Sequence, residues 1–117
     1  MDVVEFSDTY CRKDNKSVFL TVEVGNGHLG RMKVELDGIE IYKGDPVTDL
    51  EIQAGTKLFV RTNVAVRGQS KNALVTTTLK SGKGSGPDCS GSGIWVQNKE
   101  LAETGDTVNF DDTFTLK

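Results

Sequence analysis

The feature that most constrains the fold is an alternation of apolar and polar residues between Thr56 and Lys80. Over Thr56–Arg67 every second residue suits a buried face, and the alternation resumes over Ala73–Lys80 after the polar break Gly68–Asn72. Period-two alternation rich in β-branched residues and closed by turn formers is typical of β-strands with one buried face. We therefore predict two antiparallel strands here, in the middle of an all-β domain. The expected inward residues are Leu58, Val60, Thr62, Val64, Val66, Val75, Thr77 and Leu79.

Shorter alternating segments occupy most of the remaining chain, and none has the period of an amphipathic helix. They predict strands at Asp2–Tyr10, Ser17–Val24, Arg31–Leu36, Ile39–Tyr42, Asp49–Gln53 and Thr107–Lys117, and a small hairpin over Ile94–Ala102 with Asn98-Lys99 at its turn. In the last strand Asp112 interrupts the apolar phase, and we expect a bulge that lets its carboxylate reach solvent.

These segments define the expected architecture. A chain of 117 residues is the size of one domain. We predict a single antiparallel β-sandwich over residues 1–117, immunoglobulin- or fibronectin-like, with eight or nine strands. A small closed β-barrel of the OB type is the alternative.

Asp37-Gly38 gives the strongest local signal. The pair stands between the apolar segments Val34–Leu36 and Ile39–Tyr42. Asp-Gly is a preferred sequence for a two-residue type I′ hairpin turn, which needs positive φ at both positions. Such a turn would place Leu36 opposite Ile39 and Val34 opposite Ile41.

Ile52–Leu58, with the sequence IQAGTKL, resembles the Leu-x-Pro-Gly-Thr-x-Tyr corner of fibronectin type III domains. Ala54 replaces the proline of that motif and Leu58 replaces its tyrosine. The resemblance covers about a tenth of the chain and implies a sandwich fold.

Charge and cysteine content limit the environment and the partners. The net charge is −3 with both signs interleaved, which makes nucleic acid an unlikely partner for the whole molecule. The sequence has no apolar run long enough for a membrane span and no leader peptide, so we expect no membrane partner and either a cytoplasmic protein or a mature exported domain. Without an export signal, Cys11 and Cys89 are expected to be free thiols.

The segment Ser81–Gly93 is rich in glycine and serine and has no large apolar residue. Its composition predicts a flexible loop. Loops on a rigid scaffold are common recognition sites, so the first functional hypothesis is a non-enzymatic protein-interaction or structural module that presents this loop to a protein partner. Lys83 and Asp88 are its candidate contact residues.

Three aromatic residues suggest a second binding mode. Trp95, Phe59 and Tyr42 each stand on the opposite phase from the aliphatic residues of their strand. Exposed aromatic rings bind sugars and small ligands, so carbohydrate binding through Trp95 is the alternative function.

Lys57, Phe59, Arg61 and Arg67 share one phase, and this basic–aromatic pattern makes a single-stranded nucleic-acid-binding barrel a further alternative.

Catalytic and metal-binding signals are weak. His28, the single histidine, lies in the turn Gly25–Gly30, and we expect it to be solvated. This turn matches the glycine pattern of dinucleotide-binding loops, but a strand follows it where a helix is required. We expect no enzyme activity and no cofactor.

Carboxylates cluster at Asp45 with Asp49 and at Asp106 with Asp111 and Asp112, and the second cluster is a weak candidate for Ca²⁺ because carboxylates are hard oxygen ligands. Aspartates more often cap turns and protect strand edges, so we expect no bound metal.

Overall fold

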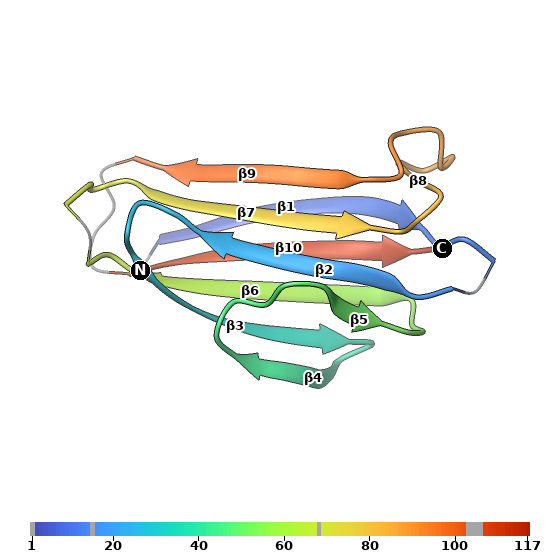
Figure 1. Ribbon diagram of the computed structural model, residues 1–117, viewed down its shortest axis with the longest axis horizontal. Coiled ribbons are helices and arrows are strands. Elements are labelled where there is room, and N and C mark those ends of the chain that lie inside the picture. Colours follow the sequence, from blue (N-terminus) through green and yellow to red (C-terminus); the bar gives the residue numbers. More distant parts are fainter. Residues whose placement is uncertain (1, 15, 68, 103–106) are drawn as a thin grey trace.

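The computed structural model describes residues 2–14, 16–67, 69–102 and 107–117; Gly68 and Asp106, both named above, lie outside these ranges. The described residues form ten β-strands and no helix (Figure 1), so the predicted all-β sandwich is confirmed, with more strands than expected. The strands are β1 (Asp2–Cys11), β2 (Val18–Val24), β3 (Leu29–Leu36), β4 (Ile39–Gly44), β5 (Leu50–Ile52), β6 (Lys57–Ala65), β7 (Ala73–Lys80), β8 (Gly84–Ser85), β9 (Trp95–Leu101) and β10 (Thr107–Leu116).

The strands form two sheets that pack face to face. The larger sheet has the order β4-β3-β6-β10-β1-β8 and the smaller has the order β5-β2-β7-β9. No strand in the described part of the chain belongs to both sheets, so the closed barrel is not formed. β6 and β7 lie in different sheets, so the prediction that they form an antiparallel pair is wrong: the chain crosses from one sheet to the other between them.

One strand pair departs from the antiparallel pattern. β1 and β10 are parallel and paired from Asp2↔Val108 to Tyr10↔Leu116, along the 44 Å axis of the molecule. The N- and C-terminal ends consequently lie at opposite ends of this axis (Figure 1).

The core lies between the sheets and follows the alternation of the strands. On β6 Leu58, Val60, Thr62 and Val64 are buried, and their odd-numbered neighbours face the outer side. On β7 Val75, Thr77 and Leu79 are buried as predicted. Period two thus identified the inner face of these central strands.

The Asp37-Gly38 turn joins β3 to β4 with φ of 52° and 83°, which confirms positive φ at both central residues. Leu36 pairs with Ile39 as expected, but Val34 pairs with Tyr42 and not with Ile41. The prediction for Ile41 is wrong because the register shifts between Val34 and Glu35, which leaves one additional residue on β4.

Two predictions near the C-terminal end are also wrong. Asn98-Lys99 forms no turn, because β9 continues through both residues and pairs with β7 from Trp95 to Leu101. Asp112 forms no bulge: β10 keeps a continuous register with β6, and Asp112 stays on the inward phase with 0% exposure.

Candidate functional site

Trp95 lies in the core and not on the surface. Its exposure is 6%, its Nε1 donates a hydrogen bond to Asp8 Oδ2 at 2.7 Å, and its ring meets Phe114 edge-on at a centroid distance of 4.7 Å. The expected exposure is wrong because Trp95 pairs with the buried Leu79, and directly paired residues point to the same face of a sheet. The neighbouring Val96 is exposed instead, so Trp95 offers no surface for a sugar ring.

Phe59 and Tyr42 do not compensate for the loss of Trp95. Phe59 lies on the outer face of the larger sheet, where the Arg61 guanidinium covers its ring at 5.6 Å. Tyr42 packs against the core and donates a hydrogen bond from its hydroxyl to the Asp45 carbonyl at 2.7 Å. The three aromatic candidates therefore lie in separate places and form no common platform.

Backbone hydrogen bonds attach the segment Ser81–Gly93 to β1 and connect residues within it. Lys83 N donates to Cys11 O at 2.7 Å, Gly86 N to Thr9 O at 2.9 Å, and Gly91 N to Ser85 O at 2.9 Å. The residues of β8 within it pair with β1. Glycine here allows the backbone to approach β1 closely and bond to it, while the flexibility expected from composition stays a prediction.

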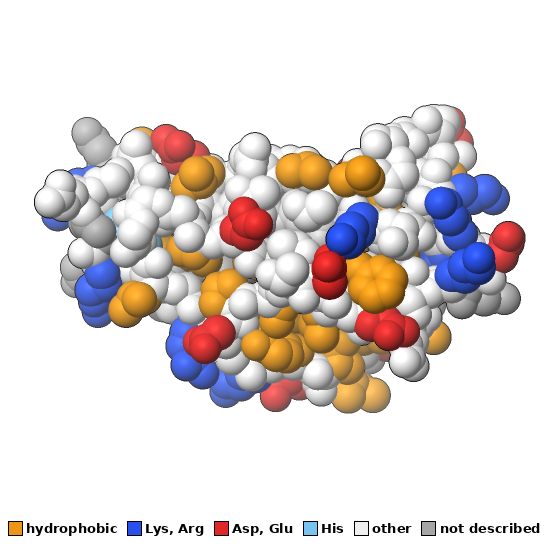
Figure 2. All heavy atoms as spheres, in the orientation of Figure 1, with side chains coloured by type: hydrophobic (Ala, Val, Ile, Leu, Met, Phe, Trp, Pro, Cys, Tyr) orange, Lys and Arg blue, Asp and Glu red, His pale blue; other side chains and the backbone are white. Residues whose placement is uncertain are grey.

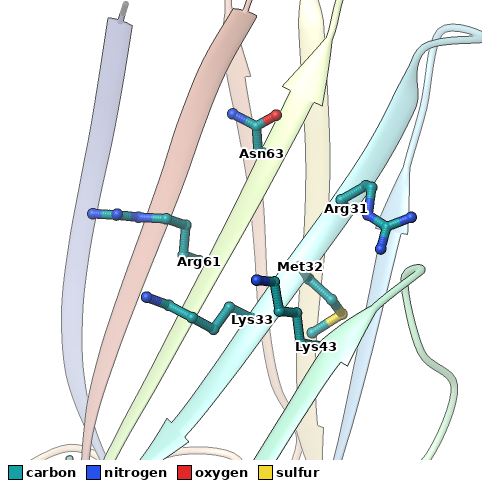
Figure 3. A pocket seen from close by; sticks show the side chains of 6 residues that line it. All are labelled: Arg31, Met32, Lys33, Lys43, Arg61 and Asn63. Carbon is teal, nitrogen blue, oxygen red and sulfur yellow. The ribbon is translucent and has the colours of Figure 1, made fainter. Parts of the chain in front are cut away.

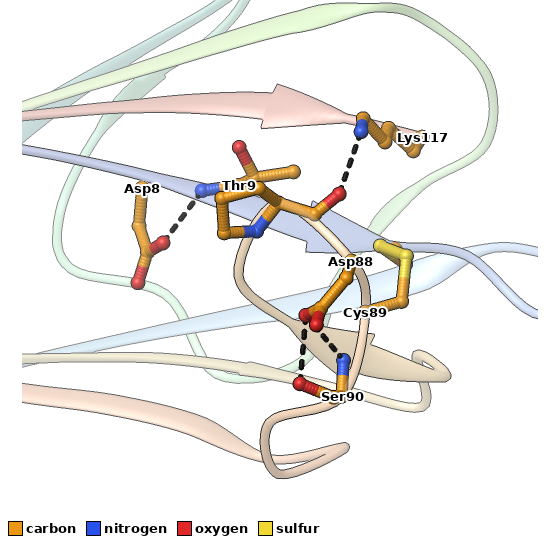
Figure 4. The surroundings of a disulfide bond; sticks show 8 residues. Asp8, Thr9, Asp88, Cys89, Ser90 and Lys117 are labelled. Atoms are coloured by element: carbon orange, nitrogen blue, oxygen red, sulfur yellow. Dashed lines mark hydrogen bonds between the residues drawn. A yellow bond between two sulfur atoms is a disulfide. The ribbon is translucent and has the colours of Figure 1, made fainter.

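Cys11 and Cys89 form a disulfide that fixes this loop to the end of β1 (Figure 4), so the expectation of free thiols is wrong. The two cysteines are 78 residues apart in sequence with a Cα–Cα distance of 5.7 Å. Strand pairing between β1 and β8 brings them together, and no local sequence signal encodes that contact.

The loop exposes both of its candidate contact residues. Lys83 and Asp88 lie at the surface; Lys83 directly precedes β8 in the sequence and Asp88 follows it. Asp88 Oδ1 accepts hydrogen bonds from the Ser90 hydroxyl at 2.7 Å and the Ser90 backbone N–H at 3.2 Å (Figure 4). These two bonds lower the pKa of Asp88, so the carboxylate stays charged and supports the loop's own conformation.

The outer face of the larger sheet carries a shallow cationic hollow of about 250 Å³ on β3, β4 and β6 (Figure 3). Its lining residues are Arg31, Met32, Lys33, Lys43, Arg61 and Asn63.

Carboxylates neutralise most of the charge of this hollow. Arg61 makes a bidentate pair with Asp111, with distances of 2.8 and 2.9 Å, and these hydrogen bonds raise the pKa of Arg61. Lys33 Nζ lies 3.4 Å from Glu35 Oε2 and forms an ion pair with it. In the described part of the chain, Lys43 is the lining cation without an ion pair. Arg61 belongs to the basic–aromatic face expected to bind nucleic acid, and its charge is neutralised by Asp111.

The metal candidates do not converge. Asp106 lies outside the described residues, Asp111 faces outward to Arg61, and Asp112 faces the core. Successive residues of a strand point to opposite faces, so Asp111 and Asp112 cannot share an ion. Within the described ranges no three metal-ligating side chains come together.

His28 is structural and not solvated as expected. It is 6% exposed, its Nε2 lies 2.7 Å from the Asn72 carbonyl, and its Nδ1 accepts a hydrogen bond from Arg67 N at 3.1 Å. Since Nδ1 accepts, Nε2 carries the proton and donates it to the carbonyl. His28 therefore connects the turn before β3 to the segment between β6 and β7.

Sequence reasoning missed the apolar edge of β4. Ile39 and Ile41 are 69% and 44% exposed. Beside them a groove of about 310 Å³ is lined by Leu36, Ile41, Glu51, Gln53 and Ala54. Figure 2 shows hydrophobic side chains gathered over the part of the molecule where β4 and β5 lie. The register shift leaves Ile41 out of the expected pairing with Val34, and period two alone does not reveal that shift.

Fold and surface together define a two-sheet β-sandwich with one disulfide-fixed loop and one open apolar edge. Comparison with known proteins finds no family model, no curated protein and no solved structure that matches the chain. The described residues contain no helix of the length and apolar character that a membrane crossing requires.

Proposed function

We propose that this domain is a non-enzymatic structural module that resists a pulling force applied between its two ends. The observation that carries the proposal is the parallel pairing of β1 with β10 along the long axis. A force that separates the two ends pulls these strands past one another, and all hydrogen bonds of the pair then resist at the same time. If both strands were pulled apart at the same end of the pair, their hydrogen bonds would instead break one after another.

The disulfide supports the same function. If β1 and β10 separate, the bond between Cys11 and Cys89, at a sequence separation of 78, keeps the chain between them from extending. At about 3.5 Å per extended residue, this removes roughly 270 Å of possible extension. A disulfide also supports an oxidising environment, because reducing compartments keep thiols free.

Single-molecule force spectroscopy tests this proposal. One sample carries handles at the N- and C-terminal ends, and the control carries them at the N-terminal end and at Thr107, where β10 begins beside the start of β1. We expect the first geometry to need a several-fold higher rupture force. Equal rupture forces in the two geometries would refute the proposal.

A second function, protein binding at the edge of β4, is favoured by the exposed Ile39 and Ile41 and the adjoining groove. Among the strands that the structure describes, β4 is the last of its sheet, so no described strand pairs with its outer backbone groups. An extended segment of a partner protein would add there as a further strand, with apolar side chains in the groove.

This binding function can be tested with peptides selected from a random display library against the protein. We expect the selected peptides to lose affinity at least tenfold for Ile41→Lys and to keep it for Val96→Lys. Val96 is a matched control because it is 52% exposed on β9, the edge strand of the other sheet. Peptides that are insensitive to Ile41→Lys would remove this function.

A further inference from the structure

Lys99 and Asp112 bring opposite charges together in the middle of the sandwich. Lys99 lies on β9 in the smaller sheet and Asp112 on β10 in the larger sheet, and both side chains point into the core. Their side-chain exposures are 3% and 0%, and Lys99 Nζ is in direct contact with Asp112 Oδ1. A buried amine and a buried carboxyl group thus connect the two sheets.

The hydrogen bonds around this pair are too few for two ions. A lysine ammonium group has three N–H donors. Within the described ranges, Lys99 Nζ and Asp112 Oδ1 make no hydrogen bond to any further group. The centroid of the Phe6 ring lies 5.6 Å from Nζ, and this ring is a further neighbour that favours a cation. A buried ion pair needs nearly complete hydrogen bonding to offset the loss of hydration, and this one lacks it.

An amide bond would suit the same site better. A secondary amide has one N–H donor and one carbonyl acceptor. The second carboxyl oxygen, Asp112 Oδ2, already accepts a hydrogen bond from Thr77 Oγ1 at 2.9 Å. If Oδ2 became the amide carbonyl oxygen, Thr77 would satisfy it without any movement.

We propose that Lys99 and Asp112 condense to form an intramolecular isopeptide bond that links the two sheets. A proton passes from the ammonium group to Oδ1, which leaves a neutral amine and a neutral carboxylic acid. Nζ then attacks Cγ, the N–C bond forms, the bond from Cγ to Oδ1 breaks, and Oδ1 leaves as water with the second amine proton. No oxidant, metal or cofactor takes part, and the net charge does not change.

The surroundings favour each requirement of this reaction. Burial, the larger effect, lowers the pKa of Lys99 to about 8, and the nearby Asp111 partly opposes this. The lowered pKa favours the neutral amine that acts as the nucleophile. The fold holds Nζ against the carboxyl group, and such placement corresponds to effective concentrations on the order of 10⁵ M or more.

The aromatic residues near the pair exclude water, which would reverse the reaction. Phe6 lies opposite Asp112 in the β1–β10 register. Trp95 packs 5.5 Å from Phe6 and 4.7 Å from Phe114, measured between ring centroids. Thr77 acts as a positioning residue, since its hydroxyl holds Oδ2 and stabilises the negative charge that develops there during attack.

Intact mass spectrometry of the reduced, alkylated and denatured protein tests the proposal, independently of the mechanical function proposed above. We expect a wild-type mass lower than the sequence mass by one water, and a branched peptide joining Lys99 to Asp112 after proteolysis. Lys99→Met and Asp112→Ala should each restore the full mass. The double variant Lys99→Met/Asp112→Leu, which buries no charge, provides the same control if the single variants do not fold.

Two results would overturn the proposal. The first is a wild-type protein at its full sequence mass, which would leave the pair as a non-covalent contact. The second is a loss of one water that persists in Lys99→Met. Cyclisation at Asp37-Gly38 also releases one water, and both this control and the branched peptide distinguish that event from the isopeptide bond. Thr77→Val should slow formation of the bond at least tenfold and preserve the fold.

Discussion

Replacement of Gly84 by alanine tests the attachment of the loop to β1 most directly, because Gly84 lies against both cysteines of the disulfide. It pairs with Cys11 on β1, and a Cβ atom added to it would clash with the Cys89 carbonyl oxygen. The added atom would also lie 2.8 Å from the Gly91 carbonyl oxygen. These neighbours are backbone atoms held by the disulfide and by the β8 hydrogen bonds, so they cannot rotate away as a side chain could.

The expected cost follows from that geometry. Overpacking of a well-packed site costs about 1–3 kcal/mol, and the rigid backbone places Gly84→Ala at the upper end of this range. Urea unfolding of the oxidised protein measures this loss of unfolding free energy. In thermal unfolding the same loss should lower Tm by roughly 5 °C or more. The control Lys83→Ala changes an exposed neighbour in the same loop and should stay within about 0.5 kcal/mol of wild type. A Gly84→Ala protein as stable as Lys83→Ala would show that the loop is mobile after all.

Three further predictions concern the core and the crosslinks. Trp95 should emit at short wavelength and resist iodide quenching, and Trp95→Ala should cost about 3–5 kcal/mol of unfolding free energy. Reduction of Cys11–Cys89 should cost about 4 kcal/mol in urea unfolding by the chain-entropy model; an unchanged midpoint would contradict the pairing. A free Lys99 amine, with its pKa lowered from 10.5 to about 8, would make the folded state bind fewer protons than the unfolded state between these values, so stability would rise with pH there. With Lys99 linked to Asp112 we expect no such rise relative to the double variant Lys99→Met/Asp112→Leu.

The sequence was most informative where one local rule decides the structure. Alternation predicted the inner face of β6 from Leu58 to Val64 because that strand has one core side and one polar side. The Asp37-Gly38 turn followed from the need for positive φ, and the structure confirms it. Both features depend on a few adjacent residues, so no knowledge of distant contacts was needed.

The loop and the cysteines could not be predicted in this way. A glycine-rich segment is flexible in isolation, and what fixes Ser81–Gly93 is backbone hydrogen bonding to β1, far away in the sequence. The contact between Cys11 and Cys89 depends on the same pairing. Composition describes the freedom of a chain segment before it meets its partners, so it revealed neither the contacts of the loop with β1 nor the disulfide.

The expected exposure of Trp95 was wrong for a different reason, which the strand β9 makes clear. Its inward phase contains Trp95 and Lys99, while its outward phase contains the aliphatic Val96, so apolar content alone selects the wrong face. Lys99 on β9 and Asp112 on β10 each violate the rule that core positions are apolar, and taken singly they suggested a turn and a bulge. Taken together, they are opposite charges that both point into the core, from two strands that belong to different sheets. Burial of either charge alone would cost several kcal/mol, and the contact between the two side chains removes that conflict. Two complementary violations of the same pattern therefore indicate a contact across the core, and here they mark the place where we propose a covalent bond.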